Sequence, residues 1–150
     1  MKARSALTAL AVAAGVGAAS FAGAQVAMTP NEIKWEKSPF SAAELAFIVG
    51  HPGKPGPFTL RVRYPAGGKS LPHWHDVDVA VTVLSGTLLF AEGEKFEQGK
   101  MKEYPAGSFL IERAKVPHYF LMKTDVVFQA SGVGPQGFTY VNPQDDPRKK

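Results

Sequence analysis

The sequence predicts a small all-β protein with a single domain, either a sandwich or a barrel, and three observations support this. The chain has 150 residues, which is the size of one domain. It contains 15 Gly and 12 Pro, a content that suits short strands joined by turns better than a helical bundle. Short apolar or alternating segments recur between these turn residues, and none extends for long at helical spacing.

The first 24 residues are typical of a secretory signal peptide. Lys2 and Arg4 form a basic start, residues 6–17 are apolar, and Ala22-Gly23-Ala24 supplies the small residues that precede a cleavage site. The apolar run is short for a membrane span. We therefore expect a periplasmic or secreted protein of residues 25–150 with no membrane span after cleavage. The alternative is an uncleaved helix that anchors the protein.

Composition and charge exclude several functional classes. The chain has no cysteine, which excludes a disulfide scaffold, thiolate zinc sites, iron–sulfur clusters and cysteine nucleophiles. The formal net charge of +4 comes largely from the leader and from Arg148-Lys149-Lys150 at the end. No basic stripe remains for nucleic acid, so we expect no nucleic-acid partner. The sequence also lacks a Ser-His-Asp arrangement, a dinucleotide-binding glycine motif and a P-loop.

The expected elements follow in order along residues 25–150. Residues 25–44 form an N-terminal extension with a short helical turn at 41–44, and residues 142–150 form a C-terminal tail. Residues 58–64 alternate between apolar and polar side chains, which predicts a strand with one buried face. Ser85-Gly86 predicts a tight hairpin. Strands are expected at 45–49, 58–64, 77–84, 87–90, 102–104, 109–112, 118–122, 126–130 and 138–141.

His73 and His75 form a pair separated by one residue. In a strand, side chains two residues apart point to the same face, so both imidazoles should lie side by side. We expect that face to continue into an apolar row that faces the interior. Asp76 and Asp78 fall on the opposite face, which argues against either carboxylate as a metal ligand. The apolar row consists of Val77, Val79, Val81 and Val83.

His118 follows a proline and opens another expected strand, which brings its imidazole near the same rim. Taken alone, a pair of this kind is weak evidence, and His118 alone would be read as a buried, hydrogen-bonded residue. His51 lies in a Gly-His-Pro-Gly turn, and we interpret it as a loop residue.

Two stretches resemble the conserved motifs of the cupin superfamily. The first is GGKSLPHWHDVDVAVTVLSG, residues 67–86, with a Gly, the histidine pair, a following acid and a closing Gly. The second is PAGSFLIERAKVPH, residues 105–118, with a turn followed by a Pro and the third histidine. The resemblance implies a double-stranded β-helix, or jelly-roll barrel. It also implies that His73, His75 and His118 hold a metal.

Val79 departs from that pattern. Many cupins place a glutamate ligand four residues after the second histidine, where this sequence has valine. By strand alternation this side chain faces the interior, so the carboxylate is missing from its own place. Glu44, Glu112 or another acid would have to replace it through a detail of the fold that the sequence does not show. Three neutral imidazoles would leave the metal charge uncompensated and favour an anionic or chelating small molecule.

The resemblance also implies a function. Three-histidine cupins include dioxygenases that act on diketones or thiols, so a mononuclear non-haem metal oxidoreductase is the leading interpretation. Fe(II) is favoured, and Zn, Ni, Mn or Cu also suit imidazole ligands. The alternatives are a non-catalytic cupin that binds a metal or small ligand as a sensor or storage module, and a barrel without metal. A homodimer is compatible with each. The candidate pocket residues are Val79, Tyr119, Gln129 and Tyr104.

Overall fold

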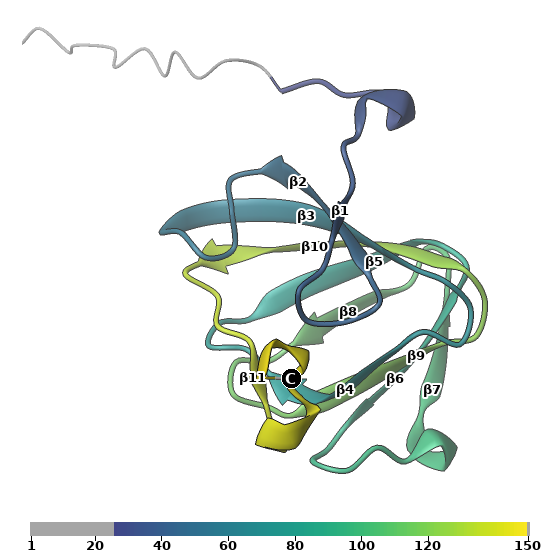
Figure 1. The fold of residues 1–150 in the computed structure, drawn as a ribbon. Helices are drawn as coiled ribbons and strands as arrows, with labels where there is room; N and C mark the ends of the chain where they lie inside the picture. Colours follow the sequence, from purple (N-terminus) through teal and green to yellow (C-terminus); the bar gives the residue numbers. More distant parts are fainter. Residues whose placement is uncertain (1–25, 150) are drawn as a thin grey trace, which may run out of the picture.

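The computed structural model describes residues 26–149, and these form two antiparallel β-sheets that face each other (Figure 1). The six-stranded sheet has the order β1-β2-β3-β10-β5-β8, and the five-stranded sheet has the order β11-β4-β9-β6-β7. The predicted signal peptide, residues 1–24, lies outside the described residues. The strands are β1 (Glu36–Lys37), β2 (Glu44–Val49), β3 (Gly56–Tyr64), β4 (Lys69–Trp74), β5 (Val79–Ser85), β6 (Thr87–Glu92), β7 (Lys102–Pro105), β8 (Phe109–Glu112), β9 (His118–Met122), β10 (Val126–Gly134) and β11 (Thr139–Tyr140).

The helical content of the described chain is limited to single 3-10 turns, η1 (Pro30–Glu32), η2 (Gln98–Lys100), η3 (Pro143–Asp145) and η4 (Pro147–Lys149). Among residues 26–149 there is no helix with the length and apolar character that a membrane span requires. The predicted all-β jelly-roll class is confirmed. The helical turn expected at 41–44 is wrong, because Ser41 accepts a hydrogen bond from the Ala43 N–H and β2 already begins at Glu44.

The core lies between the two sheets and follows the alternation read from the sequence. On β3, Phe58, Leu60, Val62 and Tyr64 are buried, while the residues between them face outward. β10 lies beside β3 and places Phe128 opposite Val62. These inward rows pack against buried residues of the facing sheet, among them Leu88, Phe120 and Met122. Burial of this apolar surface stabilises the barrel.

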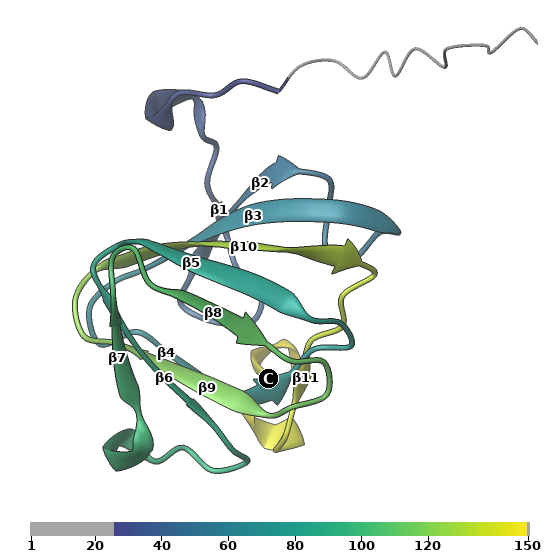
Figure 2. The ribbon, with the colours of Figure 1, turned by 180° about the vertical axis from the view of Figure 1, so that it is seen from behind.

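The chain repeatedly crosses from one sheet to the other, and this corrects two expectations. The turn at Ser85-Gly86 is not a hairpin, because β5 pairs with β10 and β8 whereas β6 pairs with β9 and β7. Gly86 has a φ of 76°, and a Cβ there would lie 2.0 Å from the Asp125 carbonyl oxygen. Glycine therefore allows a tight corner between the sheets. In the reverse view, β5 and β8 lie above β9 and β6 (Figure 2).

A second crossing follows the histidine pair. β4 belongs to the five-stranded sheet and ends at Trp74, and β5 begins at Val79 in the six-stranded sheet. The expected continuous row from His73 to Val83 is therefore wrong, although both ends of it face the interior. Asp76 and Asp78 are exposed, as alternation predicted.

Candidate metal centre

The three predicted histidines meet in the interior of the barrel. His73, on β4, lies opposite His118, the first residue of β9, and His75 follows directly after β4. All three are buried, with at most 5% of each residue exposed. One ring nitrogen from each lies within 4.8 Å of the others. The convergence predicted from the sequence is confirmed, and it joins two segments separated by 43 residues.

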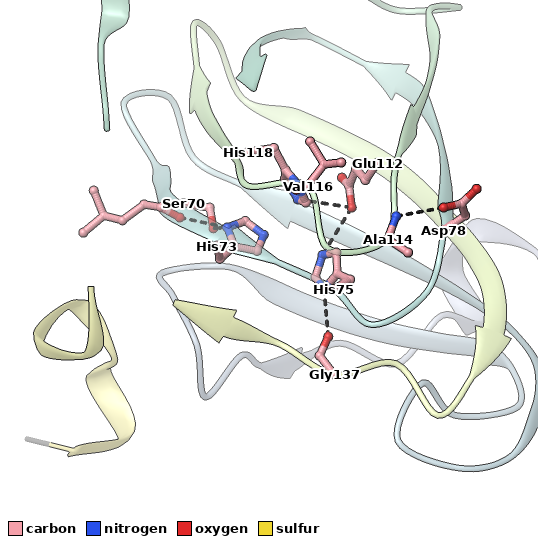
Figure 3. A network of polar contacts seen from close by, with 10 residues as sticks. Ser70, His73, His75, Asp78, Glu112, Ala114, Val116, His118 and Gly137 are labelled. Atoms are coloured by element: carbon pink, nitrogen blue, oxygen red, sulfur yellow. Dashed lines mark hydrogen bonds and ion pairs between the residues drawn. The ribbon is translucent and has the colours of Figure 1, made fainter. Parts of the chain in front are cut away.

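The hydrogen bonds of the imidazoles fix which nitrogen faces the centre of the cluster. The Nδ1 atom of each ring lies at hydrogen-bond distance from a backbone carbonyl (Figure 3). A carbonyl only accepts, so each Nδ1 carries the proton and each Nε2 keeps a lone pair for a metal. Among the described residues, the Nε2 of His118 is a buried side-chain atom with no hydrogen-bond partner. The acceptors for His73, His75 and His118 are the carbonyl oxygens of Leu71, Gly137 and Val116, at 2.8, 2.9 and 3.0 Å.

Burial also favours the neutral form of two of these rings, His73 and His118. It holds the pKa of His73 well below 6.5, and the neighbouring His118 and His75 lower that pKa further. Burial likewise lowers the pKa of His118, although the nearby Glu112 carboxylate opposes the effect. A neutral imidazole is the form that binds a metal, so the cluster fits a divalent cation near neutral pH.

Glu112, on β8 of the other sheet, lies beside two of the three histidines. Its side chain is 4% exposed, and one carboxylate oxygen lies 3.2 Å from His75 Nε2 and 3.5 Å from His118 Nε2. Ligand atoms bound to one ion at about 2.1 Å and at right angles lie roughly 3 Å apart, so these separations suit a shared metal. The residue opposite Glu112 in the β5–β8 ladder is Val79. The carboxylate therefore comes from β8, the strand next to Val79, where the cupin pattern would place a glutamate.

The sequence did contain a signal for Glu112. On β8, Leu110 and Glu112 are buried, whereas Phe109 and Ile111 face outward. An acid on the inward row of a strand costs free energy unless it has a partner, which makes such a residue a candidate for a site. The sequence did not show the strand pairing that places β8 beside β5. Glu44, the other acid considered, instead pairs with Arg63 at 2.7 Å on the outer surface.

Three of the four candidate pocket residues lie away from the histidine cluster. Gln129 is on the outward row of β10 and accepts a hydrogen bond from Arg61. Tyr119 points away from its neighbours His118 and Phe120, and its hydroxyl donates to the Glu97 carbonyl oxygen at 3.3 Å. Tyr104 packs against the ring of Phe90 in the core. Strand alternation explains the first two placements, and Val79 is the only one of the four candidates that lines the cavity described below.

The loop between β8 and β9 links the chain segments that form the site. The Lys115 N–H donates to the His75 carbonyl oxygen at 2.7 Å. Asp78 accepts hydrogen bonds from the Ala114 N–H and the Arg113 guanidinium, both at 2.8 Å. These contacts tie the segment that carries His75 to the segment that carries Glu112 and His118. Lys115 has a φ of 64°, a left-handed conformation that is unusual for a residue with a side chain.

A cavity of about 420 Å³ opens beside the histidines and Glu112. Its walls are mainly apolar and include Leu60, Val62, Phe120 and Phe128 from the barrel. The segments at the two ends of the described chain cover one side of it. Phe138 stacks on the His73 ring, with centroids 4.2 Å apart, and on Phe40, with centroids 4.6 Å apart. The arrangement can bind a metal next to an apolar small molecule.

The cavity wall includes residues that sequence analysis missed. His51, interpreted as a loop residue, lies in the loop between β2 and β3 and lines the cavity. Ser41, Tyr64 and Arg148 also line it. These residues come from distant segments that meet only when the barrel closes, so no local pattern in the sequence marks them.

Comparisons with known proteins agree with this geometry. Residues 60–130 match the family described as cupin domain. No significant match was found among curated proteins. Three similar solved structures are the polyketide cyclase RemF from Streptomyces resistomycificus, an acetylacetone dioxygenase from Acinetobacter johnsonii and an RmlC-like cupin from Shewanella frigidimarina.

The likeness to these structures is one of fold. The cyclase has 18% sequence identity and a TM-score of 0.67, with 82% of this chain and 89% of that chain covered. The dioxygenase has 17% identity and a TM-score of 0.59, covering 90% and 84%. The RmlC-like cupin has 11% identity and a TM-score of 0.56, covering 78% and 92%. Residues 60–130 thus match a cupin domain, the described chain shares the fold of these structures, and its histidine cluster suits a divalent metal.

Proposed function

We propose that this cupin is a mononuclear metal enzyme in which His73, His75, His118 and Glu112 hold one divalent cation, with Fe(II) favoured. The observation that carries the proposal is the orientation of the three imidazoles. Each Nδ1–H is bound to a carbonyl, which leaves three Nε2 lone pairs in one cluster and a buried carboxylate beside two of them. Without a cation, these acceptors would face one another in the protein interior at a cost in free energy.

The proposed reaction is an oxygen-dependent oxidation of a small chelating molecule. A bound Fe(II) would supply a Lewis acid and a site where substrate and O₂ react. The chain's own residues contribute binding and shielding. Leu60, Val62 and Phe128 offer an apolar surface for the body of the substrate, and Phe138 covers His73 and keeps water from that side.

The charge of the proposed centre favours a substrate whose metal-binding group carries one negative charge. The Glu112 carboxylate offsets one of the two positive charges of the cation, so the site does not carry the full uncompensated charge expected from three imidazoles alone. A monoanion, such as the enolate of a 1,3-diketone, would bring the centre to neutrality. A structural neighbour is an acetylacetone dioxygenase, which makes the 1,3-diketones a reasonable class to test first.

The alternative of a non-catalytic binding module rested on Val79, because loss of a carboxylate ligand suggests loss of catalysis. The position of Glu112 removes that reason, because its carboxylate, on the strand next to Val79, lies beside the histidines. The metal-free barrel is disfavoured by the unpartnered Nε2 of His118. We therefore favour the enzyme.

The test is oxygen uptake by the Fe(II)-loaded protein. Protein without a polyhistidine tag is reconstituted anaerobically, its iron content is measured, and acetylacetone and its phenyl analogue are added in an oxygen electrode. We expect uptake of one O₂ per substrate molecule, and none with the His73→Ala, His118→Ala double variant. Iron-loaded wild type that consumes no more oxygen than this variant with either diketone would refute the proposed oxidation of diketones.

We also propose export from the cytoplasm, on the basis of the N-terminal sequence alone. Lys2, Arg4 and the Ala22-Gly23-Ala24 site predict cleavage after Ala24. Mass spectrometry of the protein from its native host should find a chain that begins at Gln25. A cytoplasmic protein that keeps the leader would contradict this proposal.

A further inference from the structure

A second polar cluster lies in the cavity wall, formed by the hydroxyl groups of Ser41, Tyr64 and Ser70. Ser70 and Tyr64 are buried, and Ser41 is half-buried. The three side chains come from the loop before β2, the end of β3 and the second residue of β4. In a wall that is mainly apolar, such hydroxyls either satisfy one another or bind a ligand.

Two hydrogen bonds anchor these hydroxyls. Ser70 Oγ lies 3.2 Å from His73 Nδ1. The Tyr64 hydroxyl donates to Ser41 Oγ at 2.6 Å. Ser41 therefore holds the Tyr64 hydroxyl, and Ser70 lies beside the metal-binding cluster.

Ser41 has one proton left to donate. A serine hydroxyl accepts two hydrogen bonds and donates one. Ser41 Oγ already accepts from the Tyr64 hydroxyl and from the Ala43 N–H at 3.3 Å. Within residues 26–149, no acceptor for the Ser41 proton is recorded, and the side chain borders the cavity. The remaining donor is therefore available to a molecule in the cavity.

The acceptor in such a molecule should be uncharged. Among residues 26–149, Arg148 is the only Lys or Arg that lines the cavity, and its guanidinium is engaged by the Asp146 carboxylate at 2.7 and 2.8 Å. A carboxylate placed beside Ser41 would therefore lie among apolar side chains without a free cation, which is costly. A ketone, ester or ether oxygen carries no such cost.

We propose that Ser41, oriented by Tyr64, donates a hydrogen bond to a neutral oxygen of the substrate, remote from the group that binds the metal. This inference rests on the proposed function and specifies its substrate class. The substrate has a chelating oxygen pair at the metal, an apolar body against Val62 and Phe128, and a second acceptor oxygen at the Ser41 end. A simple diketone such as acetylacetone has only the first of these features.

The experiment measures the binding of matched probes to the Co(II)-loaded protein through the ligand-field bands of the metal. The probes are 1-phenylbutane-1,3-dione and its two derivatives with an acetyl group at position 3 or position 4 of the phenyl ring. Wild type should bind the better acetyl derivative about two- to tenfold more tightly than the parent, the range expected for one neutral hydrogen bond. Ser41→Ala should bring this ratio to about one and leave the affinity for the parent unchanged.

Ser38→Ala is the matched control, because Ser38 lies in the same loop and also lines the cavity. It should keep the wild-type ratio, and Tyr64→Phe should reduce it. An acetyl preference that survives in Ser41→Ala, or that is absent from wild type, would overturn the inference alone. Co(II)-loaded protein whose bands respond to none of the probes would overturn chelation at the metal, and with it both proposals.

Discussion

Val79 and Glu112 face each other across the β5–β8 ladder, so a carboxylate on either strand would reach the same space. We predict that Glu112→Val weakens metal binding by about tenfold or more, since it removes a proposed ligand. Adding Val79→Glu on the facing strand should restore much of the affinity. Competition with a chelating indicator measures both effects.

Glu44→Gln is the control for this exchange, because Glu44 is paired with Arg63 on the surface, away from the histidines. It should bind metal like wild type. Unchanged affinity in Glu112→Val would mean that the carboxylate is only an ion-pair partner of His75 and His118. Failure of the double variant alone would mean that position 79 lies too far from the metal.

Lys115 holds a left-handed backbone conformation in the loop between Glu112 and His118. Its ammonium group lies 3.9 Å from the centroid of the Trp74 ring and pairs with Asp76. Lys115→Gly and Lys115→Ala both remove these contacts, but only glycine also relieves the backbone strain. We predict that the glycine variant is more stable than the alanine variant by about 1 kcal/mol in urea unfolding. Equal stability would show that the loop carries no such strain.

At the scale of elements, the segment after β10 links the barrel to the metal centre. Its Gly137 carbonyl accepts from His75, and its Phe138 ring stacks on His73. A Cβ at Gly134 would lie 2.2 Å from the Lys54 carbonyl oxygen and 2.8 Å from that of Pro52. Gly134→Ala should therefore displace this segment, lower the free energy of unfolding by about 1–3 kcal/mol and weaken metal binding.

Thermal unfolding and metal titration together test this prediction. The control is Gly99→Ala, since a Cβ there meets nothing within 4 Å. This variant should resemble wild type in both measurements. A Gly134→Ala protein that is destabilised but binds metal normally would show that the segment supports the fold without orienting His75 and His73.

The sequence predicted most of the strands because alternation is local. Phe58 and Val62 are buried as expected, and β8 and β9 have the predicted bounds. Pairing is not local. Nothing near Gly86 distinguishes a hairpin from a corner between sheets, and nothing near Glu112 shows that Val79 lies opposite. The histidine cluster was predictable from its two motifs, whereas the fourth acid and the cavity wall depend on register and barrel closure.

At the scale of the whole molecule, the buried imidazoles couple stability to pH. Burial lowers the pKa of His73 and His118 in the folded protein below the ordinary 6.5. The unfolded chain therefore binds more protons below pH 6.5 than the folded chain does, and stability falls as the pH falls. For metal-free protein we predict a loss of up to about 1.4 kcal/mol per pH unit for each such proton.

The free energy of unfolding measured in urea between pH 8 and pH 5 checks this dependence. The slope below pH 6.5 should become shallower in a His73→Asn, His118→Asn variant, which has no imidazole at either position. Bound metal should keep the slope or make it steeper, because it excludes protons from the same Nε2 atoms of the folded protein. A metal-free wild type whose stability does not change from pH 7 to pH 5 would contradict this account.

The central claim is that one cation is bound by three imidazoles and Glu112. Anomalous diffraction from crystals of untagged protein, recorded on both sides of the absorption edge of the metal found by elemental analysis, tests it most directly. We predict one strong peak per chain, at about 2.1 Å from the Nε2 atoms of His73, His75 and His118 and from a carboxylate oxygen of Glu112. A metal located elsewhere, or an ordered cluster without a peak in metal-supplemented crystals, would contradict the claim.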